Sequence, residues 1–485
     1  MKKFMILSAA ALVAVCFASC DKNGNNTNLD EAVEDGFYVA GEATGVNELK
    51  PAYMMTAGIN EAADQTKRSG MYEKYIVLQG GKDFDLKLYE AGKKTRYSAT
   101  LAEFTPEEGS TIYGEDPQMA IMKGELKTGD TAPAMKVAAT GLYHIVLDLN
   151  KAGDLANAQI IVAPVEWGVR GAMNGWGFTK MEATEFSNEG ITYTIKDAEM
   201  SKNGEFKFAY GGAWKITLDD AGKVRANTNL GNVQEGVAED ALAAGGKNIK
   251  VEKAGLYDIT LTFKLTAGEL GASYKSTIKL TQESTLPEEM YMIGAGIQGW
   301  NLAEGGDAVA MHPFHSQPGQ FWAIRYIEAG SDKGFKFSPI NTGWGKDFTD
   351  LGNGTGFTVS DGNCFVAESG LYTLQVDYAN NKVIVEPAVI VGMAEPFGNA
   401  NWNKDLESAR FTINGKLASY TTVAAGQQIR TCVVCTLSGD WWHAEFIPKD
   451  GKIVYREAGG DPEMVAIEAG KKITYDFNAG TGVVE

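Results

Sequence analysis

A pattern of alternating apolar and polar residues recurs along the chain at intervals of about 115 residues. In each copy, Gly-Leu-Tyr precedes a run with apolar side chains at every second position, over residues 141–147, 255–261 and 370–376. This period of two is typical of an antiparallel strand with one buried face. His144 occupies a polar position of the first copy, so we expect it to point to solvent. A fourth copy at 470–477 keeps the alternation with a shift of one residue, which indicates a bulge or an insertion.

A second pattern opens each repeat. It is a short β-rich run that ends in glycine, at residues 37–41, 167–171, 291–294 and 389–392. The two patterns together divide most of the chain into four units, residues 36–164, 165–286, 287–386 and 387–485. Repeats of this length are separate domains, because solenoid repeats run to only about 20–50 residues. Short alternating strands, glycine-rich turns and almost no helical period predict an all-β fold of four tandem β-sandwich domains, with one helical turn at 240–245.

The first residues are predicted to be a signal peptide, residues 1–19. Two lysines precede an apolar run over 4–18, which ends in small residues directly before Cys20. A cysteine in this place is typical of the bacterial lipobox, in which it becomes the lipidated first residue of the mature protein. The alternative is a signal peptide with a cysteine there by chance. Residues 20–35 then form a polar segment rich in Asn and Asp, which predicts a flexible tether behind the lipid anchor at Cys20.

The composition excludes some partners and chemistries. The formal net charge is -18, which argues against nucleic acid or anionic lipid as the main partner. Four histidines and five cysteines leave little material for a metal site or a disulfide scaffold. Cys432 and Cys435 stand three residues apart in a β-rich run, where their side chains face opposite sides, so we predict neither a zinc site nor a redox pair. No metal and no cofactor are predicted.

Tryptophans carry the strongest signal, because all nine follow residue 166. Trp176, Trp300 and Trp402 each lie in a Gly- and Asn-rich loop after the opening strand of units two, three and four. A large apolar ring in such a loop has no core to enter, so a repeated exposed ring indicates a contact surface. Trp167 and Trp322 lie in strand-like runs and are predicted to be buried.

A second tryptophan follows a Phe-Lys-Phe motif in two units. Trp214 follows Lys207 and Trp344 follows Lys336, and the alternation points both lysines outward. Seven residues before each Gly-Leu-Tyr strand stand Asn248 and Asn363. In the fourth unit the same alignment gives Trp442 as the second ring, with Cys435 at the lysine position and Glu463 at the asparagine position, so we expect that site to lack the cation.

Two aromatic faces, a long donor and an amide are the elements of a sugar site. The C–H faces of a pyranose stack on indole, while lysine and asparagine reach the ring hydroxyls. An angled pair of rings suits a curved α-1,4-glucan, and a flat pair suits cellulose. The rings could instead merely cover the ends of the sandwiches. Three similar units favour binding modules over an active site, but glycoside hydrolysis needs only two carboxylates, so a surface glycoside hydrolase and a protein-binding adhesin or structural surface protein remain alternatives.

The order of four features resembles the surface starch-binding lipoproteins of the starch utilization system, the SusE/SusF type: the lipobox, the Trp-free first unit, the loop tryptophans and the Phe-Lys-Phe motifs. The length of four units is most similar to SusF. The resemblance implies an immunoglobulin-like spacer at 36–164 and three noncatalytic starch-binding modules at 165–286, 287–386 and 387–485. It implies a lipid-anchored place on the outer face of the outer membrane, beside a porin-like transporter, where the protein retains starch and maltooligosaccharides. The implied sites are Trp176, Lys207, Trp214 and Asn248; Trp300, Lys336, Trp344 and Asn363; and Trp402 with Trp442.

Overall fold

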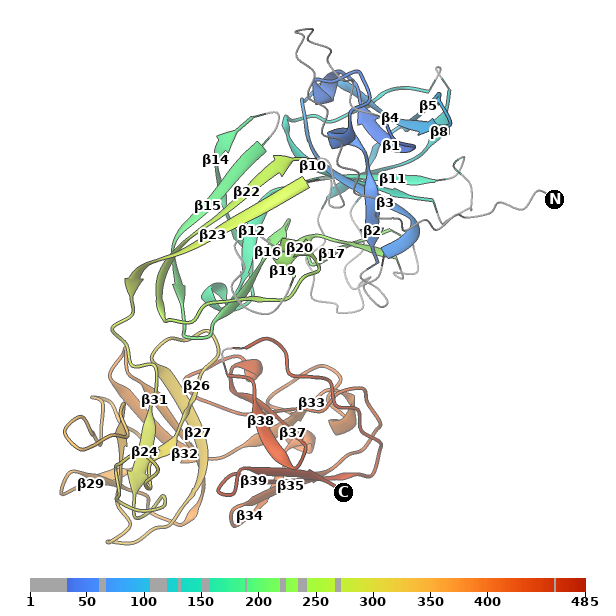
Figure 1. The fold of residues 1–485 in the computed structure, drawn as a ribbon. Coiled ribbons are helices and arrows are strands. Elements are labelled where there is room, and N and C mark those ends of the chain that lie inside the picture. The colour runs from blue at the N-terminus through green and yellow to red at the C-terminus, as the bar shows by residue number, and fades with distance from the viewer. Residues whose placement is uncertain are drawn as a thin grey trace, which may run out of the picture.

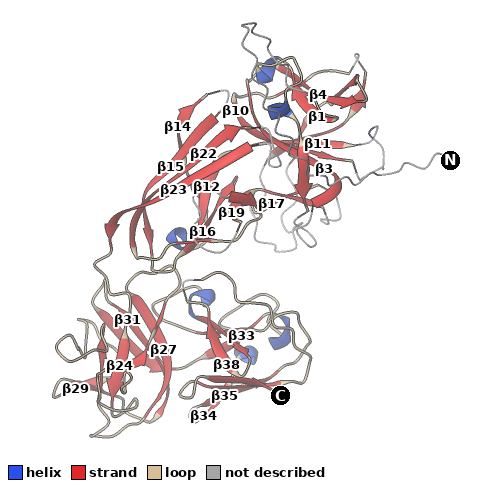
Figure 2. Ribbon diagram, in the orientation of Figure 1, coloured by secondary structure: helices blue, strands red, loops and turns tan. Residues whose placement is uncertain are grey.

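The computed structural model describes residues 33–60, 67–104, 120–129, 132–149, 155, 158–187, 190–218, 224–233, 242–266, 272–457 and 459–485. The predicted signal peptide, Cys20 and most of the predicted tether lie outside these residues. The all-β prediction is confirmed: the described residues form antiparallel sheets, and their helices are 3₁₀ turns of three or four residues (Figures 1 and 2). The boundaries of the four units stay a prediction, and each predicted unit contains at least two sheets.

The first unit holds two sheets. One contains β1 (Gly36–Ala40), β4 (Asp83–Glu90), β5 (Lys93–Ser98) and β8 (Lys127–Thr128), with β9 (Met135–Lys136) paired to β4. The other runs in the order β2 (Thr56–Ile59), β3 (Lys67–Leu78), β10 (Gly141–Asp148), β11 (Gln159–Pro164), β7 (Ile121–Glu125) and β6 (Ala102–Phe104). The 3₁₀ turns η1 (Glu42–Thr44) and η2 (Pro51–Tyr53) follow the first strand.

The second unit has two main sheets and a short hairpin. The first sheet runs β13 (Thr179–Lys180), β12 (Trp167–Gly171), β16 (Glu205–Tyr210), β19 (Asn229–Asn232) and β20 (Leu242–Ala244), with β21 (Ile249–Lys250) paired to β16. The second runs β14 (Glu182–Phe186), β15 (Gly190–Met200), β22 (Gly255–Leu265) and β23 (Ala272–Glu283), and the hairpin joins β17 (Lys215–Thr217) to β18 (Arg225–Asn227). The helical turn predicted at 240–245 is wrong in its described part, because Leu242–Ala244 pair as a strand.

Units three and four repeat the two-sheet arrangement. Unit three has β25 (Val309–Ala310), β24 (Tyr291–Gly294), β28 (Phe335–Ser338), β30 (Asn363–Phe365) and β29 (Thr358–Ser360) in one sheet, and β26 (His312–Pro313), β27 (Gln320–Ile327), β31 (Gly370–Asp377) and β32 (Lys382–Pro387) in the other. Unit four has β33 (Ile390–Met393), β36 (Arg430–Val433), β37 (Glu445–Lys449) and β38 (Lys452–Tyr455), then β34 (Thr412–Asn414), β35 (Leu417–Thr421), β39 (Lys472–Asp476) and β40 (Thr481–Val484). Its 3₁₀ turns are η5 (Glu395–Phe397), η6 (Glu407–Ala409) and η7 (Trp441–Ala444).

One hydrogen bond explains the Gly-Leu-Tyr repeat. In each of the first three copies the tyrosine hydroxyl donates to the carbonyl four residues upstream: Tyr143 to Ala139 at 2.7 Å, Tyr257 to Lys253 at 2.8 Å and Tyr372 to Glu368 at 2.7 Å. This is the tyrosine corner of β-sandwich domains, which fixes how the chain enters a central strand. The fourth copy has no such tyrosine, because Lys472 stands two residues after Gly470; its Tyr475 lies further along the strand, fully buried, with its hydroxyl 2.9 Å from that of Thr431.

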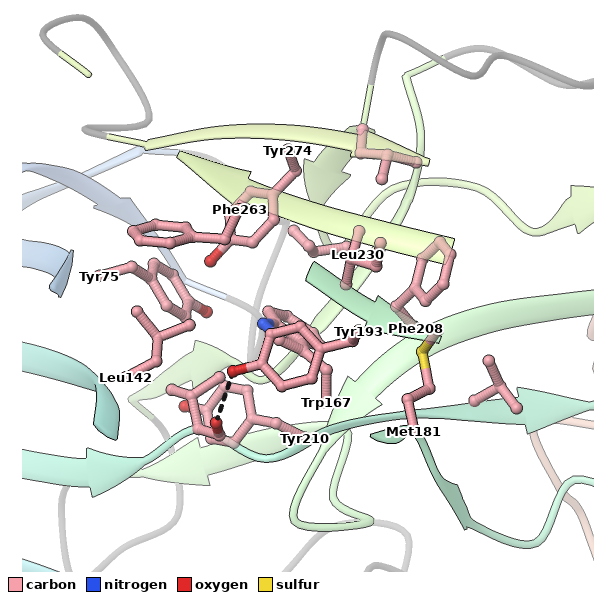
Figure 3. Close-up of a cluster of buried hydrophobic side chains, with 14 of the residues drawn as sticks. Tyr75, Leu142, Trp167, Met181, Tyr193, Phe208, Tyr210, Leu230, Phe263 and Tyr274 are labelled. Atoms are coloured by element: carbon pink, nitrogen blue, oxygen red, sulfur yellow. Dashed lines mark hydrogen bonds between the residues drawn. The ribbon is translucent and has the colours of Figure 1, made fainter. Parts of the chain in front are cut away.

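A continuous aromatic core joins the first two units (Figure 3). The ring of Tyr75 in β3 lies 6.2 Å from that of Trp167 in β12 and 5.7 Å from that of Tyr274 in β23, measured between ring centroids. Burial raises the pKa of the Tyr75, Tyr210 and Tyr274 phenols, so all three stay protonated. The first two units therefore share one core along this seam.

The expectation that His144 points to solvent is wrong. Its side chain is fully buried and its ring stacks on Tyr75 with 4.1 Å between centroids. Its two ring nitrogens lie 2.6 Å from the Tyr210 hydroxyl and 2.8 Å from a carboxylate oxygen of Glu73. The strand alternates as predicted, but its polar face packs against the second unit instead of facing water.

Units three and four also dock against each other. Trp322 of β27 lies 6.2 Å from the Phe446 ring of β37 and is 1% exposed. The buried Arg325 guanidinium donates to the carbonyls of Phe477 and Asn478 at 3.3 and 3.1 Å. The predicted burial of Trp322, and of Trp167 at 0% exposure, is confirmed.

Replacing Tyr372 with phenylalanine removes the corner hydrogen bond while keeping the ring. We expect Tyr372→Phe to lower the free energy of unfolding by about 1 kcal/mol, because the Glu368 carbonyl loses its donor. Urea denaturation of the full chain measures this. Tyr378→Phe is the matched control, since that tyrosine is 38% exposed, and equal effects of the two changes would contradict a role for the corner.

Candidate functional site

The loop that carries the first tryptophan of each site leaves the opening strand through a tight turn. In unit two, β12 leads into η4 (Ala172–Asn174), and Gly175 then adopts a left-handed conformation with φ of 59°. Trp176 and Trp402, from corresponding loops, also have positive φ angles, of 60° and 54°. A bulky residue in this region costs about 1–3 kcal/mol, and such residues cluster at functional sites. The backbone therefore favours a contact role for these rings over simple coverage.

The structure brings together two tryptophans in each of the last three units. Trp176 and Trp214 have ring centroids 6.1 Å apart with an angle of 52° between the ring planes. Trp300 and Trp344 lie 6.1 Å apart at 38°, and they are 36% and 50% exposed. These four rings belong to none of the buried hydrophobic clusters of the described residues, whereas Trp402 and Trp441 of the fourth unit pack against its core. Each pair forms two faces set at an angle, which follow a curved chain better than a flat one.

The predicted lysines lie beside the second ring. The Lys207 ammonium is 5.9 Å from the centroid of Trp214 and donates to the Asn229 side chain at 3.1 Å. The Lys336 ammonium is 6.0 Å from the centroid of Trp344 and 2.8 Å from the Asp347 carboxylate. The hydrogen bond from Lys336 holds the pKa of Asp347 below its usual value, so this pair stays ionised. Both sites thus place a cation within about 6 Å of an indole face, the range of a cation–π contact.

The predicted asparagines occupy matching strand positions. Ile249 pairs with Phe206 and Cys364 pairs with Phe335, so Asn248 and Asn363 both directly precede a residue paired with the Phe-Lys-Phe strand. Asn248 donates to the Glu205 carboxylate at 2.7 Å, whereas Asn363 makes a longer bond to the Asp361 carbonyl at 3.4 Å. Each amide is half-buried next to the strand that carries the lysine.

The third site has a different second ring from the predicted one. Trp402 pairs with Trp441, at 5.2 Å between centroids and 29° between planes, rather than with Trp442. Trp441 begins the 3₁₀ turn η7, and Trp442 points instead toward His315 and Arg456. The sequence alignment misplaced this ring because the segment between β36 and η7 is longer than its counterparts in the other two units.

The third site also has the cation that the alignment denied it. Strand pairing places Met393 opposite Arg430, as it places Ile293 opposite Lys336 and Arg170 opposite Lys207. The Arg430 guanidinium lies 5.9 Å from the Trp402 centroid and 5.5 Å from that of Trp441. Burial alone would lower the pKa of Arg430, but hydrogen bonds to Glu445 and the charge of Asp461 outweigh it and raise the pKa. Cys435 is a buried thiol, and Glu463 forms an ion pair with Lys449.

Sequence comparison between units missed Arg170. Its guanidinium lies 4.3 Å from the Trp214 centroid, and it donates to the carbonyls of Trp176 and Gly212 at 2.8 and 3.0 Å. One side chain therefore ties both tryptophan loops of the first site together. The corresponding residues in the other units are Ile293 and Met393, so comparison of the repeats gave no signal for a cation here.

Other chemistries find little support in the described residues. Burial raises the pKa of the Cys432 and Cys435 thiols, which disfavours the thiolate that metal binding or redox exchange needs. Among the residues that the structure describes, no group of three or more His, Cys, Asp or Glu side chains could hold a metal ion. Within the same residues, no helix has the length and apolar character needed to cross a membrane.

Comparison with known proteins finds starch-binding modules similar to the last two units. Residues 289–384 and 389–483 match the family model described as SusF/SusE starch-specific CBMs. The chain is 27% identical over 386 residues to the outer membrane protein SusF of Bacteroides thetaiotaomicron, covering 74% of each protein. The crystal structure of SusF from the same organism aligns with 93% of this chain and 100% of the SusF chain, at 18% identity and a TM-score of 0.38. Residues 289–384 and 389–483 are thus similar to starch-specific modules of the SusF/SusE type, and about three quarters of the chain is similar to an outer membrane protein.

Proposed function

We propose that the chain is a surface lipoprotein that binds starch, maltooligosaccharides and other α-1,4-glucans without cleaving them. Its three sites are Trp176 with Trp214, Trp300 with Trp344, and Trp402 with Trp441. The observation that carries the proposal is the threefold occurrence of an angled indole pair beside a cation. The match of the last two units to starch-specific modules supports it.

The chemistry of the sites fits a polysaccharide. Indole faces stack on the apolar C–H faces of glucose, and the neighbouring cation and amide donate to ring hydroxyls. Angles of 52° and 38° between the ring planes of the first two pairs suit the curvature of an α-1,4-linked chain, and the third pair, at 29°, is nearly stacked. Half-exposed sites of this kind bind weakly alone, but three sites on one chain act at high effective concentration on a polymer.

The proposal includes the place and the role of the protein. Lipidation at Cys20 and a tether over 20–35 would hold the first unit, residues 36–164, as a spacer above the membrane. The three sites would then retain polysaccharide beside a porin-like transporter that imports it. This is the role that a noncatalytic binder on the cell surface can fill, because cleavage and import need other proteins.

Removing the loop tryptophan from all three sites should abolish binding to starch. We expect the variant with Trp176→Ala, Trp300→Ala and Trp402→Ala to lose retardation on an amylopectin affinity gel. Each site should weaken by more than about tenfold, because a stacked ring is the main apolar contact. Phe104→Ala is the control, an exposed aromatic in the Trp-free unit. Unchanged mobility of the triple variant would sink the proposal.

The same protein separates the alternatives. Calorimetric titration with maltoheptaose should give binding, while a cellooligosaccharide should give much less. Release of reducing sugar from starch by the purified protein would instead support a surface hydrolase. An adhesin or structural surface protein would show no change in tryptophan fluorescence with either sugar.

The third site offers a sharper test of its geometry. In a chain whose first two sites carry Trp176→Ala and Trp300→Ala, Trp441→Ala should weaken maltoheptaose binding by more than about tenfold, because Trp441 faces Trp402. Trp442→Ala should leave this affinity unchanged, because Trp442 faces His315 and Arg456. Titration calorimetry of both variants decides between the two rings, and the opposite ranking would restore the assignment made from sequence.

A further inference from the structure

The first site differs from the second because residues of the last two units contact it. The Trp176 indole nitrogen lies 3.3 Å from Nε2 of His315, and the two ring centroids are 6.5 Å apart. His315 belongs to the segment between β26 and β27 of unit three. Trp300, the counterpart of Trp176, is exposed, whereas Trp176 is partly buried. The chain thus contains an open and a covered form of the same site.

Trp442, which the third site does not use, forms part of this cover. Its ring lies edge-on to His315, with 4.9 Å between centroids. The tip of its indole would lie 4.0 Å from a β-carbon at Gly175, the residue before Trp176. The Arg456 guanidinium holds the ring from another direction, at 4.9 Å from its centroid. The Trp442 ring therefore packs against the loop that carries Trp176.

The cover reaches the polar end of the site as well. A β-carbon at Gly460 would lie 2.8 Å from the amide nitrogen of Asn248 and 3.2 Å from the Glu205 carboxylate. A side chain at Gly460 would therefore have to displace the ends of the Asn248 and Glu205 side chains while unit four lies against unit two. The Asn248 amide and the Trp176 indole edge, both predicted to contact sugar, are thus both in contact with the last two units.

The contact between the Trp176 indole nitrogen and His315 is unfavourable as a hydrogen bond. Nδ1 of His315 lies 2.5 Å from the Ser316 hydroxyl, and Nε2 lies 2.8 Å from the Gly459 carbonyl. Burial lowers the pKa of His315 to about 3, so the ring is neutral at physiological pH and carries one proton. That proton lies on Nε2, where the carbonyl can only accept, and the Trp176 N–H then faces another N–H. His315 is thus hydrogen-bonded to residues of the last two units, and its contact with Trp176 is weak.

We propose that His315, Trp442 and Gly460 form a cap on the first site, and that docking of this cap and binding of glucan exclude each other. This inference rests on the proposed function of the first site. If a glucan contacts Trp176 and Asn248 in the first site in the same way as Trp300 and Asn363 in the second site, it must displace the cap. The apparent dissociation constant is then the intrinsic one divided by the open fraction. A minor open state of about 10% or less makes the site roughly tenfold weaker, or more, than its uncapped form.

A single substitution tests the cap. In a chain whose second and third sites are disabled by Trp300→Ala, Trp344→Ala and Trp402→Ala, Gly460→Asp places a carboxylate against Glu205 and should undock the cap. We expect calorimetry to show the affinity of the remaining site for maltoheptaose rise by roughly tenfold or more. Trp442→Ala should act in the same direction. Gly439→Asp adds the same charge to an exposed position of the same unit with open space around it, and should change nothing.

Small-angle scattering gives a second test of the cap. In the chain with only the first site intact, maltoheptaose should increase the radius of gyration, because binding displaces the cap. An unchanged or lower affinity in Gly460→Asp and Trp442→Ala overturns the cap. If the first site binds no maltoheptaose in any variant while the wild-type chain still binds it, the cap fails and the other two sites stand. Absence of binding in the wild-type chain as well overturns the proposed function together with the cap.

Discussion

The pairing of the opening strand of each unit with its cationic strand determines the geometry of all three sites. Lys207, Lys336 and Arg430 lie opposite the residue that comes just before the turn of the loop. One ring leaves from the end of the first strand, and the other follows the second strand. Backbone hydrogen bonds between the two strands thus place two indoles and a cation together. Loop length can then vary between units, as it does before Trp441, while the site persists.

Sequence patterns predicted the parts of this arrangement that depend on local rules. The period of two and the Gly-Leu-Tyr repeat identified the central strands, because burial of one face and the tyrosine corner are local requirements. The structure pairs the loop tryptophan with the expected second tryptophan where Phe-Lys-Phe precedes it, and with a different tryptophan where Ile429, Arg430 and Thr431 replace that motif. Register between strands, which identifies Arg430, is a long-range property that counting along one strand cannot supply.

Contacts between units were the part that sequence could not predict. A polar residue on a strand indicates a face outside the local core, but it does not say what covers that face. His144 meets Tyr210, and Trp442 meets His315, in each case across a boundary between units. Arg170 was missed for a related reason: it acts on two loops at once, and no repeat of the chain shares it. These residues are visible only when separate sheets are placed side by side.

The shared core between the first two units has a mechanical consequence. Tyr75, Trp167 and Tyr274 pack across the seam, so bending between these units would expose aromatic surface to water. Drag on a polymer bound near Trp176 therefore passes into the first unit through a packed interface rather than through a slack connection. If the first site binds glucan as proposed, the first unit supports it through this packed interface, although its own sequence contains no tryptophan.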